Sequence, residues 1–139
     1  MAKRRTEKRK PGSWIYKPTR QAIYLRDNHT CYWCGATEED GSQLSLDHLV
    51  PWINYGKDNH RNLVTCCRKC NCKRGDKKLK QWYQVLEDEF GKDQEEIQEI
   101  KKKINKVRRS SDSSIKKLRD VVNGKKPYCK LTPGHSLAK

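Results

Sequence analysis

The chain has 139 residues, of which 32 are Lys or Arg and 17 are Asp or Glu, so its formal net charge is +15. Only 33% of the residues are hydrophobic, which excludes a large single core and predicts one small domain with extensions. No stretch approaches the roughly 18 consecutive apolar residues of a membrane span, and no apolar segment follows the basic N-terminus as in a secretion signal. We therefore expect a soluble, unexported protein.

The positive charge is concentrated at the two ends of the chain. Residues 1–30 carry 9 basic and 2 acidic side chains, and residues 101–139 carry 13 and 2. Charge of this sign attracts polyanions, of which nucleic acid is the usual one. We expect residues 1–18 to be a basic arm whose Lys3, Arg4 and Arg5 attract phosphates without reading sequence. A localisation signal or a solubilising tail would have the same composition.

The first half of the chain alternates between helix and strand signals. Helical spacing predicts a short helix over residues 19–27. Apolar residues that alternate with polar ones predict a strand within 42–50, ended by Pro51, and a brief apolar run at 63–64 suits a second short strand. Beyond Cys67 the sequence turns helical. We expect residues 19–78 to form the central domain.

Three amphipathic helices are predicted in residues 79–139, where apolar side chains recur at spacings of three and four. The first ends at Gly91, and a serine-rich break over 110–114 separates the other two. Their apolar positions are Leu79, Trp82, Leu86 and Phe90, then Ile97, Ile100, Ile104 and Val107, then Ile115, Leu118 and Val122. The last two helices could form an intramolecular hairpin or a dimeric coiled coil. Residues 123–139 should be irregular.

Seven cysteines in an unexported chain indicate metal ligands or reduced thiols rather than a disulfide framework. Four of them form two C-x2-C pairs, Cys31 with Cys34 and Cys67 with Cys70. Each pair can place two thiolates on one side of a tight turn, so together they predict a tetrahedral structural Zn²⁺ site. Cys66 could replace Cys67, and Cys72 lies close to Cys70, but only the chosen pair has the C-x2-C spacing.

Asp47 and His48, between the two pairs, combine a carboxylate with an imidazole at the predicted end of a strand. Hydrolysis of a phosphodiester requires an activated water and a cation that neutralises charge on the phosphoryl and leaving oxygens. The carboxylate can bind a hard cation, and the imidazole can act as general base near neutral pH. Such a pair alone is more often an ordinary surface feature, but the cysteine frame favours the catalytic interpretation.

The order of motifs over residues 20–77 closely resembles the HNH endonuclease family in its zinc-stapled form. The motifs are Cys31-x2-Cys34-Gly35, Asp47-His48-x2-Pro51, Asn62-Leu63-Val64 and Cys67-x2-Cys70-Asn71. The resemblance implies an α+β fold, in which a small ββα-metal core is stapled by the four-cysteine zinc site and followed by a helical C-terminal extension. It also implies metal-dependent DNA cleavage that leaves a 5′-phosphate and a 3′-hydroxyl.

The resemblance further implies a role for each polar site residue. His48 is expected to be the general base, Asp47 and Asn71 to hold the catalytic cation, and Asn62 to support the loop that orients the base. Oxygen ligands of this kind suit Mg²⁺ or Mn²⁺. From the residues alone, an amide before a strand is more often a local backbone hydrogen-bonding group, and two neighbours compete with Asn62 for its role, Asn59 and His60.

Double-stranded DNA is the expected partner. Lys73, Arg74 and Lys77 would form a solvated helix face in most proteins, but beside a phosphate site we expect them to contact the DNA backbone. One active site cuts one strand, so a homodimer through the C-terminal helices is one route to cutting both. The rival hypotheses are a noncatalytic zinc module that binds nucleic acid and an RNA-directed nuclease.

Small family members that stand alone resemble those encoded by phages and mobile elements, and some restriction enzymes. The resemblance therefore implies a cytoplasmic protein of a bacterial or phage-infected host cell.

Overall fold

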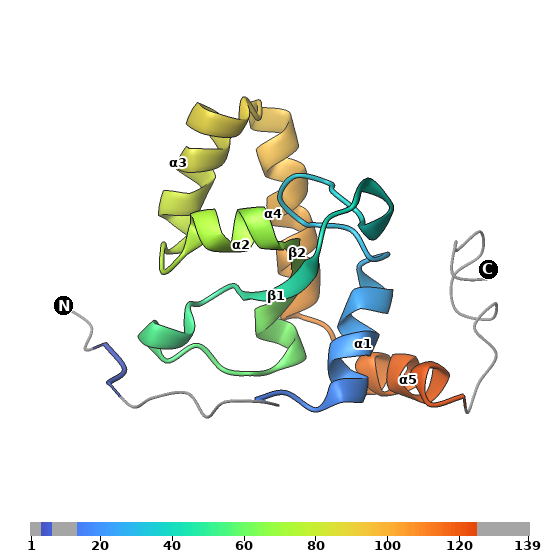
Figure 1. The fold of residues 1–139 in the computed structure, drawn as a ribbon. Coiled ribbons are helices and arrows are strands. Elements are labelled where there is room, and N and C mark those ends of the chain that lie inside the picture. The colour runs from blue at the N-terminus through green and yellow to red at the C-terminus, as the bar shows by residue number, and fades with distance from the viewer. Residues whose placement is uncertain (1–3, 7–13, 125–139) are drawn as a thin grey trace.

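Two short antiparallel strands lie at the centre of the computed structural model, which describes residues 4–6 and 14–124 (Figure 1). Seven regular elements follow in chain order, α1 (Lys17–Arg26), β1 (Leu44–His48), β2 (Leu63–Cys67), α2 (Arg68–Arg74), α3 (Leu79–Phe90), α4 (Gln94–Arg108) and α5 (Asp112–Val122). In the sheet, Leu44 pairs with Cys67 and His48 with Leu63. The predicted α+β class and the β-β-α order are confirmed.

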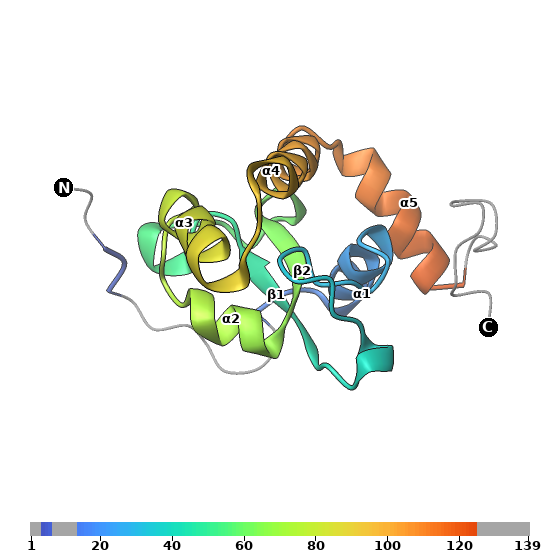
Figure 2. The ribbon, with the colours of Figure 1, turned by 90° about the horizontal axis from the view of Figure 1, so that it is seen from above.

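The two strands separate two small cores because side chains of a strand alternate between its faces. Leu46 and Leu63 point into the core beside α1, whereas Val64 and Cys66 point into the core beside α2. Figure 2 shows α2 and α3 on one side of the strands and α1 and α5 on the other. Every residue of β2 is therefore buried.

The C-terminal helices complete both cores. Trp82 and Leu86 of α3 and Ile100 and Ile104 of α4 pack with the cysteine pairs, and Ile115 of α5 packs on α1. The domain boundary predicted at residue 78 therefore lies between two segments of the sequence whose side chains pack in the same cores.

The apolar stripe of α4 lies inside the chain. Its four apolar side chains are at most 7% exposed, so they are not available to a partner helix. The coiled-coil alternative is therefore wrong for this stripe, and α4 and α5 do not form the predicted hairpin either, because α5 packs along α1. Among the described residues, no helix has the length and apolar character that crossing a bilayer requires.

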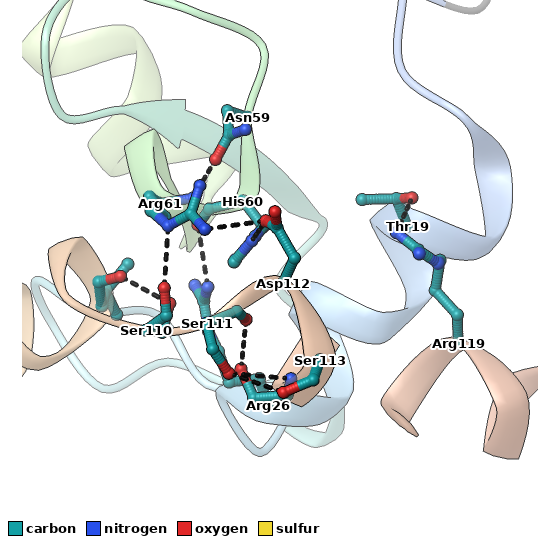
Figure 3. A network of polar contacts seen from close by, with 12 residues as sticks. Thr19, Arg26, Asn59, His60, Arg61, Ser110, Ser111, Asp112, Ser113 and Arg119 are labelled. Carbon is teal, nitrogen blue, oxygen red and sulfur yellow. Dashed lines mark hydrogen bonds and ion pairs between the residues drawn. The ribbon is translucent and has the colours of Figure 1, made fainter. Parts of the chain in front are cut away.

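A polar clamp fixes the junction of α4 and α5 to the 3₁₀ turn His60–Asn62 that leads into β2 (Figure 3). The guanidinium of Arg61 donates to the Ser110 carbonyl (2.7 Å) and to the Asp112 carboxylate (2.8 Å). His60 Nε2 lies 3.0 Å from the same carboxylate. From α1, Arg26 donates to the His60 carbonyl at 2.9 Å. The turn before β2 is thus held from two sides.

Ile104→Ala tests whether α4 belongs to the same folding unit as the cysteine segment. Replacing a buried isoleucine by alanine costs about 2–5 kcal/mol of unfolding free energy, and we expect a loss in that range in urea denaturation of the metal-loaded protein. The exposed neighbour is the control, because Lys103→Ala should change the value by less than about 0.5 kcal/mol. If both variants match the wild type, α4 does not contribute to the core.

Candidate metal centres and active site

The four cysteines of the two C-x2-C pairs converge on one point. Their sulfur atoms all lie within 4.8 Å of one another, and the Sγ atoms of Cys34 and Cys67 are 3.6 Å apart. Tetrahedral zinc with Zn–S bonds of about 2.3 Å requires sulfur atoms about 3.8 Å apart, so the cluster fits this ion. Cys66 instead points towards Ser45, with its sulfur 3.4 Å from the hydroxyl. The structure therefore brings together the four cysteines of the predicted register.

Local backbone geometry builds each half of the cluster. In the first pair, Gly35 adopts a left-handed conformation (φ +80°) and its N–H donates to the Cys31 carbonyl. In the second, the Cys67 sulfur caps α2 by accepting from the Cys70 N–H at 3.4 Å. A turn and a helix N-terminus thus aim the four sulfurs inward.

The thiols differ in acidity. A hydrogen bond from the Cys70 thiol lowers the pKa of Cys31 to about 5, whereas burial raises the pKa of Cys34 to about 11. The same hydrogen bond raises the pKa of Cys70. The protein alone favours one thiolate, on Cys31, and a bound cation must displace the remaining thiol protons.

Asp47 is the most constrained of the polar site residues. It is 5% exposed, and its Oδ2 accepts from Trp33 Nε1 and from the Arg74 guanidinium, both at 2.9 Å. Burial raises its pKa, opposed by the charge of Arg74 and by these two hydrogen bonds. Both bonds end on Oδ2, so Oδ1 has no hydrogen-bond partner among the described residues and is the oxygen available to a cation.

Asn71 lies on α2, which packs against β1, the strand that carries Asp47. Its Nδ2 donates to the Ser45 hydroxyl at 3.1 Å, and its Oδ1 accepts no hydrogen bond from the described residues. Ser45 and Asp47 share one face of β1, and Asn71 and Arg74 share one face of α2. Two hard oxygen atoms without hydrogen-bond partners thus lie on one interface, a donor set that fits Mg²⁺ or Mn²⁺.

The predicted contact of Arg74 with the DNA backbone is wrong. Its side chain is fully buried, and besides Asp47 it donates to the carbonyls of Leu49 (2.7 Å) and Lys77 (3.2 Å). A buried guanidinium needs a carboxylate and carbonyl partners, and these partners hold it between the end of β1 and the end of α2. It cannot reach a phosphate on the surface.

The other side chains that were predicted to contact DNA have different partners in the structure. Lys73 pairs with Glu89 at 2.7 Å, and the Lys77 ammonium donates to the Lys73 carbonyl at 2.9 Å. Arg4 pairs with Asp76 at 3.1 Å, both side chains being more than half exposed. The Arg5 guanidinium lies 4.4 Å from the centroid of the Trp52 ring. Lys3 lies outside the described residues.

His48 points away from the interface that holds Asp47, as the alternation of β1 requires. Its Nε2 lies 2.7 Å from the Asp58 carboxylate, and its ring centroid lies 5.2 Å from that of Trp14. The positively charged form of the ring lowers the pKa of Asp47, against the larger effect of burial, which raises it. The histidine is therefore held by a carboxylate and an aromatic ring beside the candidate cation ligand.

Asn62 ties down the loop that connects His48 to Asp58. Its Oδ1 accepts from the Val50 N–H at 2.8 Å, and its Nδ2 donates to the carbonyls of Val50 (3.1 Å) and Lys57 (3.0 Å). These three bonds hold both ends of the loop. These contacts are the local backbone hydrogen bonds that the sequence also allowed for this amide. Because they hold the loop, they also position Asp58, the partner of His48.

Trp33 and Asp58 belong to the site although sequence reasoning did not select them. Trp33 lies between two cysteines of a pair, where a buried indole needs an acceptor. That requirement was a usable signal, whereas nothing in the sequence marks Asp58 among the polar residues of its loop.

Cys70→Ser and Cys72→Ser test the ligand register. Cys70 is buried in the cluster and Cys72 is exposed outside it, although they are two residues apart. We expect the purified Cys72→Ser protein to retain one zinc ion per chain in elemental analysis, as the wild type does, because its four ligands are intact. Cys70→Ser should lose the metal and unfold at lower temperature. Equal zinc in both variants would contradict the assignment.

Comparison with known proteins adds one result. Residues 31–84 match the family model described as HNH endonuclease. No curated protein matches the chain. The matched segment contains both cysteine pairs, the His48 loop, the β1–β2 sheet, α2 and the first half of α3. By this match, residues 31–84 of the chain belong to the HNH endonuclease family.

Proposed function

We propose that the protein is a metal-dependent endonuclease that hydrolyses phosphodiester bonds of double-stranded DNA with His48 as general base. The observation that carries the proposal is the contact between His48 and Asp58 on a loop fixed by Asn62, next to the carboxylate of Asp47. A histidine held by a carboxylate is an arrangement suited to accepting a proton from water.

The contact with Asp58 determines which ring nitrogen acts. When Nε2–H donates to the Asp58 carboxylate, the lone pair of the neutral ring is on Nδ1, which takes the proton from the attacking water. The negative charge of Asp58 then stabilises the imidazolium that forms. The ring of Trp14 limits rotation of the imidazole.

Asp47 and Asn71 are the proposed ligands of the catalytic cation. When bound, Mg²⁺ or Mn²⁺ supplies positive charge to the phosphoryl and leaving oxygens. Trp33 and Arg74 donate to Oδ2 of Asp47 and leave Oδ1 for the cation. The products are a 5′-phosphate and a 3′-hydroxyl, as the resemblance implies.

A cytoplasmic location in a bacterial or phage-infected cell is part of the same proposal. Reduced thiols persist there, which the four-cysteine cluster requires. One site cleaves one strand, so a double-strand break needs a second copy or a second encounter. A homodimer would have to use a surface other than the buried stripe of α4.

His48→Ala tests the nuclease against the noncatalytic alternative. We expect the zinc-loaded wild type to convert supercoiled plasmid to nicked and linear forms with Mg²⁺ or Mn²⁺. The variant should lose on the order of 10²–10⁴-fold in rate, because the general base is gone. If neither protein cuts plasmid DNA while both retard it in a gel, a zinc-stabilised binding module is the better description. Preferential cleavage of RNA would instead support the RNA-directed nuclease.

Asp58→Asn tests the orientation of the base. The amide keeps the size of the carboxylate but removes its charge, and in one orientation it donates to Nε2 and so places the proton on Nδ1. We expect kcat to fall on the order of 10–10³-fold with little change in KM, since only the proton transfer is affected.

Two further variants separate positioning from general stability. Asp58→Glu, which restores a carboxylate on a longer side chain, should recover part of kcat. Asp120→Asn on α5 removes the same charge elsewhere and should behave like the wild type. Unchanged kcat in Asp58→Asn would refute the positioning role.

A further inference from the structure

A groove of about 540 Å³ lies between the loop that follows β1, the turn His60–Asn62 and the end of α4. Its lining brings together three basic side chains from distant parts of the sequence, Lys57, Arg61 and Arg108. None of the described residues that line it is acidic. A concave surface with one sign of charge concentrates ligands of the opposite sign.

Two of the three cations are uncompensated. Lys57 and Arg108 are exposed and form no ion pair with any described residue. Some basic side chains elsewhere on the surface, such as Lys73 and Lys102, pair with nearby glutamates, whereas others, such as Lys116, have no ion pair with a described residue. The groove therefore keeps charge that the chain itself does not neutralise.

The third cation is preorganised. The Arg61 N–H donates to the Asn59 side chain, and its Nε and one terminal nitrogen donate to Ser110 and Asp112, as Figure 3 shows. The other terminal nitrogen has no partner among the described residues. An arginine already held in one conformation loses little entropy when it binds an anion.

The groove shares its walls with the candidate active site. The backbone of Lys57 accepts from Asn62 and is followed directly by Asp58, the partner of His48. Tyr55, half exposed and in a left-handed conformation (φ +65°), also lines the groove. Anions bound here would therefore lie beside the loop that carries the reaction, as the phosphates that flank a cleaved bond must.

We propose that this groove binds phosphates of the DNA duplex next to the cleaved bond, with Lys57, Arg61 and Arg108 as the contacts. The inference rests on the proposed function and extends it to α4, because Arg108 lies beyond residues 31–84 that match the family. The C-terminal helices thereby supply part of the substrate surface as well as part of the core.

The test measures DNA binding separately from cleavage. Full-length His48→Ala, zinc-loaded, is titrated with a fluorescently labelled duplex at several salt concentrations, alone and combined with Lys57→Gln and Arg108→Gln. Each lost phosphate contact should weaken binding on the order of 8-fold at 0.1 M salt and flatten the slope of log K against log salt by about 1. The matched control is Lys116→Gln, which removes one exposed charge from α5 outside the groove.

The outcomes separate this inference from the proposed function. Weaker binding and a flatter slope for the groove variants, with Lys116→Gln unchanged, support the groove even if the wild type fails to cut. Slopes equal to that of the control overturn the groove even if the wild type cuts DNA. Tighter binding of an RNA duplex of the same length would overturn DNA as the ligand. In cleavage assays with His48 intact, the groove variants should raise KM more than they lower kcat.

Discussion

The four-cysteine cluster is the constraint on which the candidate active site depends. It joins the turn at residues 31–34 to the junction of β2 and α2. Asn71 follows a cluster cysteine directly, and Trp33 lies between two of them, so the same cluster orients a candidate cation ligand and the indole that binds Asp47. The Trp33 ring also packs edge-on against Trp82 of α3, with centroids 6.0 Å apart. Loss of the metal would therefore disturb the site and the helical part together.

The buried pair of Asp47 and Arg74 serves geometry more than stability. A buried ion pair gains little net free energy, since both charges lose their hydration. Its partners explain its value, because Arg74 also binds the carbonyls of Leu49 and Lys77 and so joins the end of β1 to the segment after α2. With Oδ2 fixed in this way, Oδ1 of Asp47 is left with one direction in which to bind a cation.

Much of the fold followed from local patterns, because each element carries its own signal. The period of apolar residues predicted the amphipathic helices and the first strand, and a short apolar run predicted the second strand. The C-x2-C spacing predicted the cluster, because it too is a pattern of a few residues. Packing was harder. Lys73, Arg74 and Lys77 have the same basic character in the sequence, and only the contact of α2 with β1 buries one of them.

The partner of His48 was hidden for a related reason. Asp58 meets the histidine only because the chain between residues 48 and 58 folds back on itself, and this loop contains several other polar residues of similar character. Likewise, the spacing of apolar residues in α4 suits a coiled coil and an intramolecular core equally well. The α4 stripe packs inside the chain because the segment with the cysteine pairs presents an apolar surface to it. No local sequence pattern reveals that surface.

The loop after β1 carries Asp58, so the contacts that hold this loop also determine the position of the candidate site. The backbone at Gly56 comes so close to Val50 that a Cβ would overlap the Val50 carbonyl oxygen, so only glycine fits there. Tyr55 adopts a left-handed backbone, a local strain that the hydrogen bonds of the loop offset. Those bonds come from Asn62, at the end of the turn that Arg61 clamps to the α4–α5 junction. Folding of the helical part therefore fixes the loop, so the proposed base would need little further ordering during the proposed reaction.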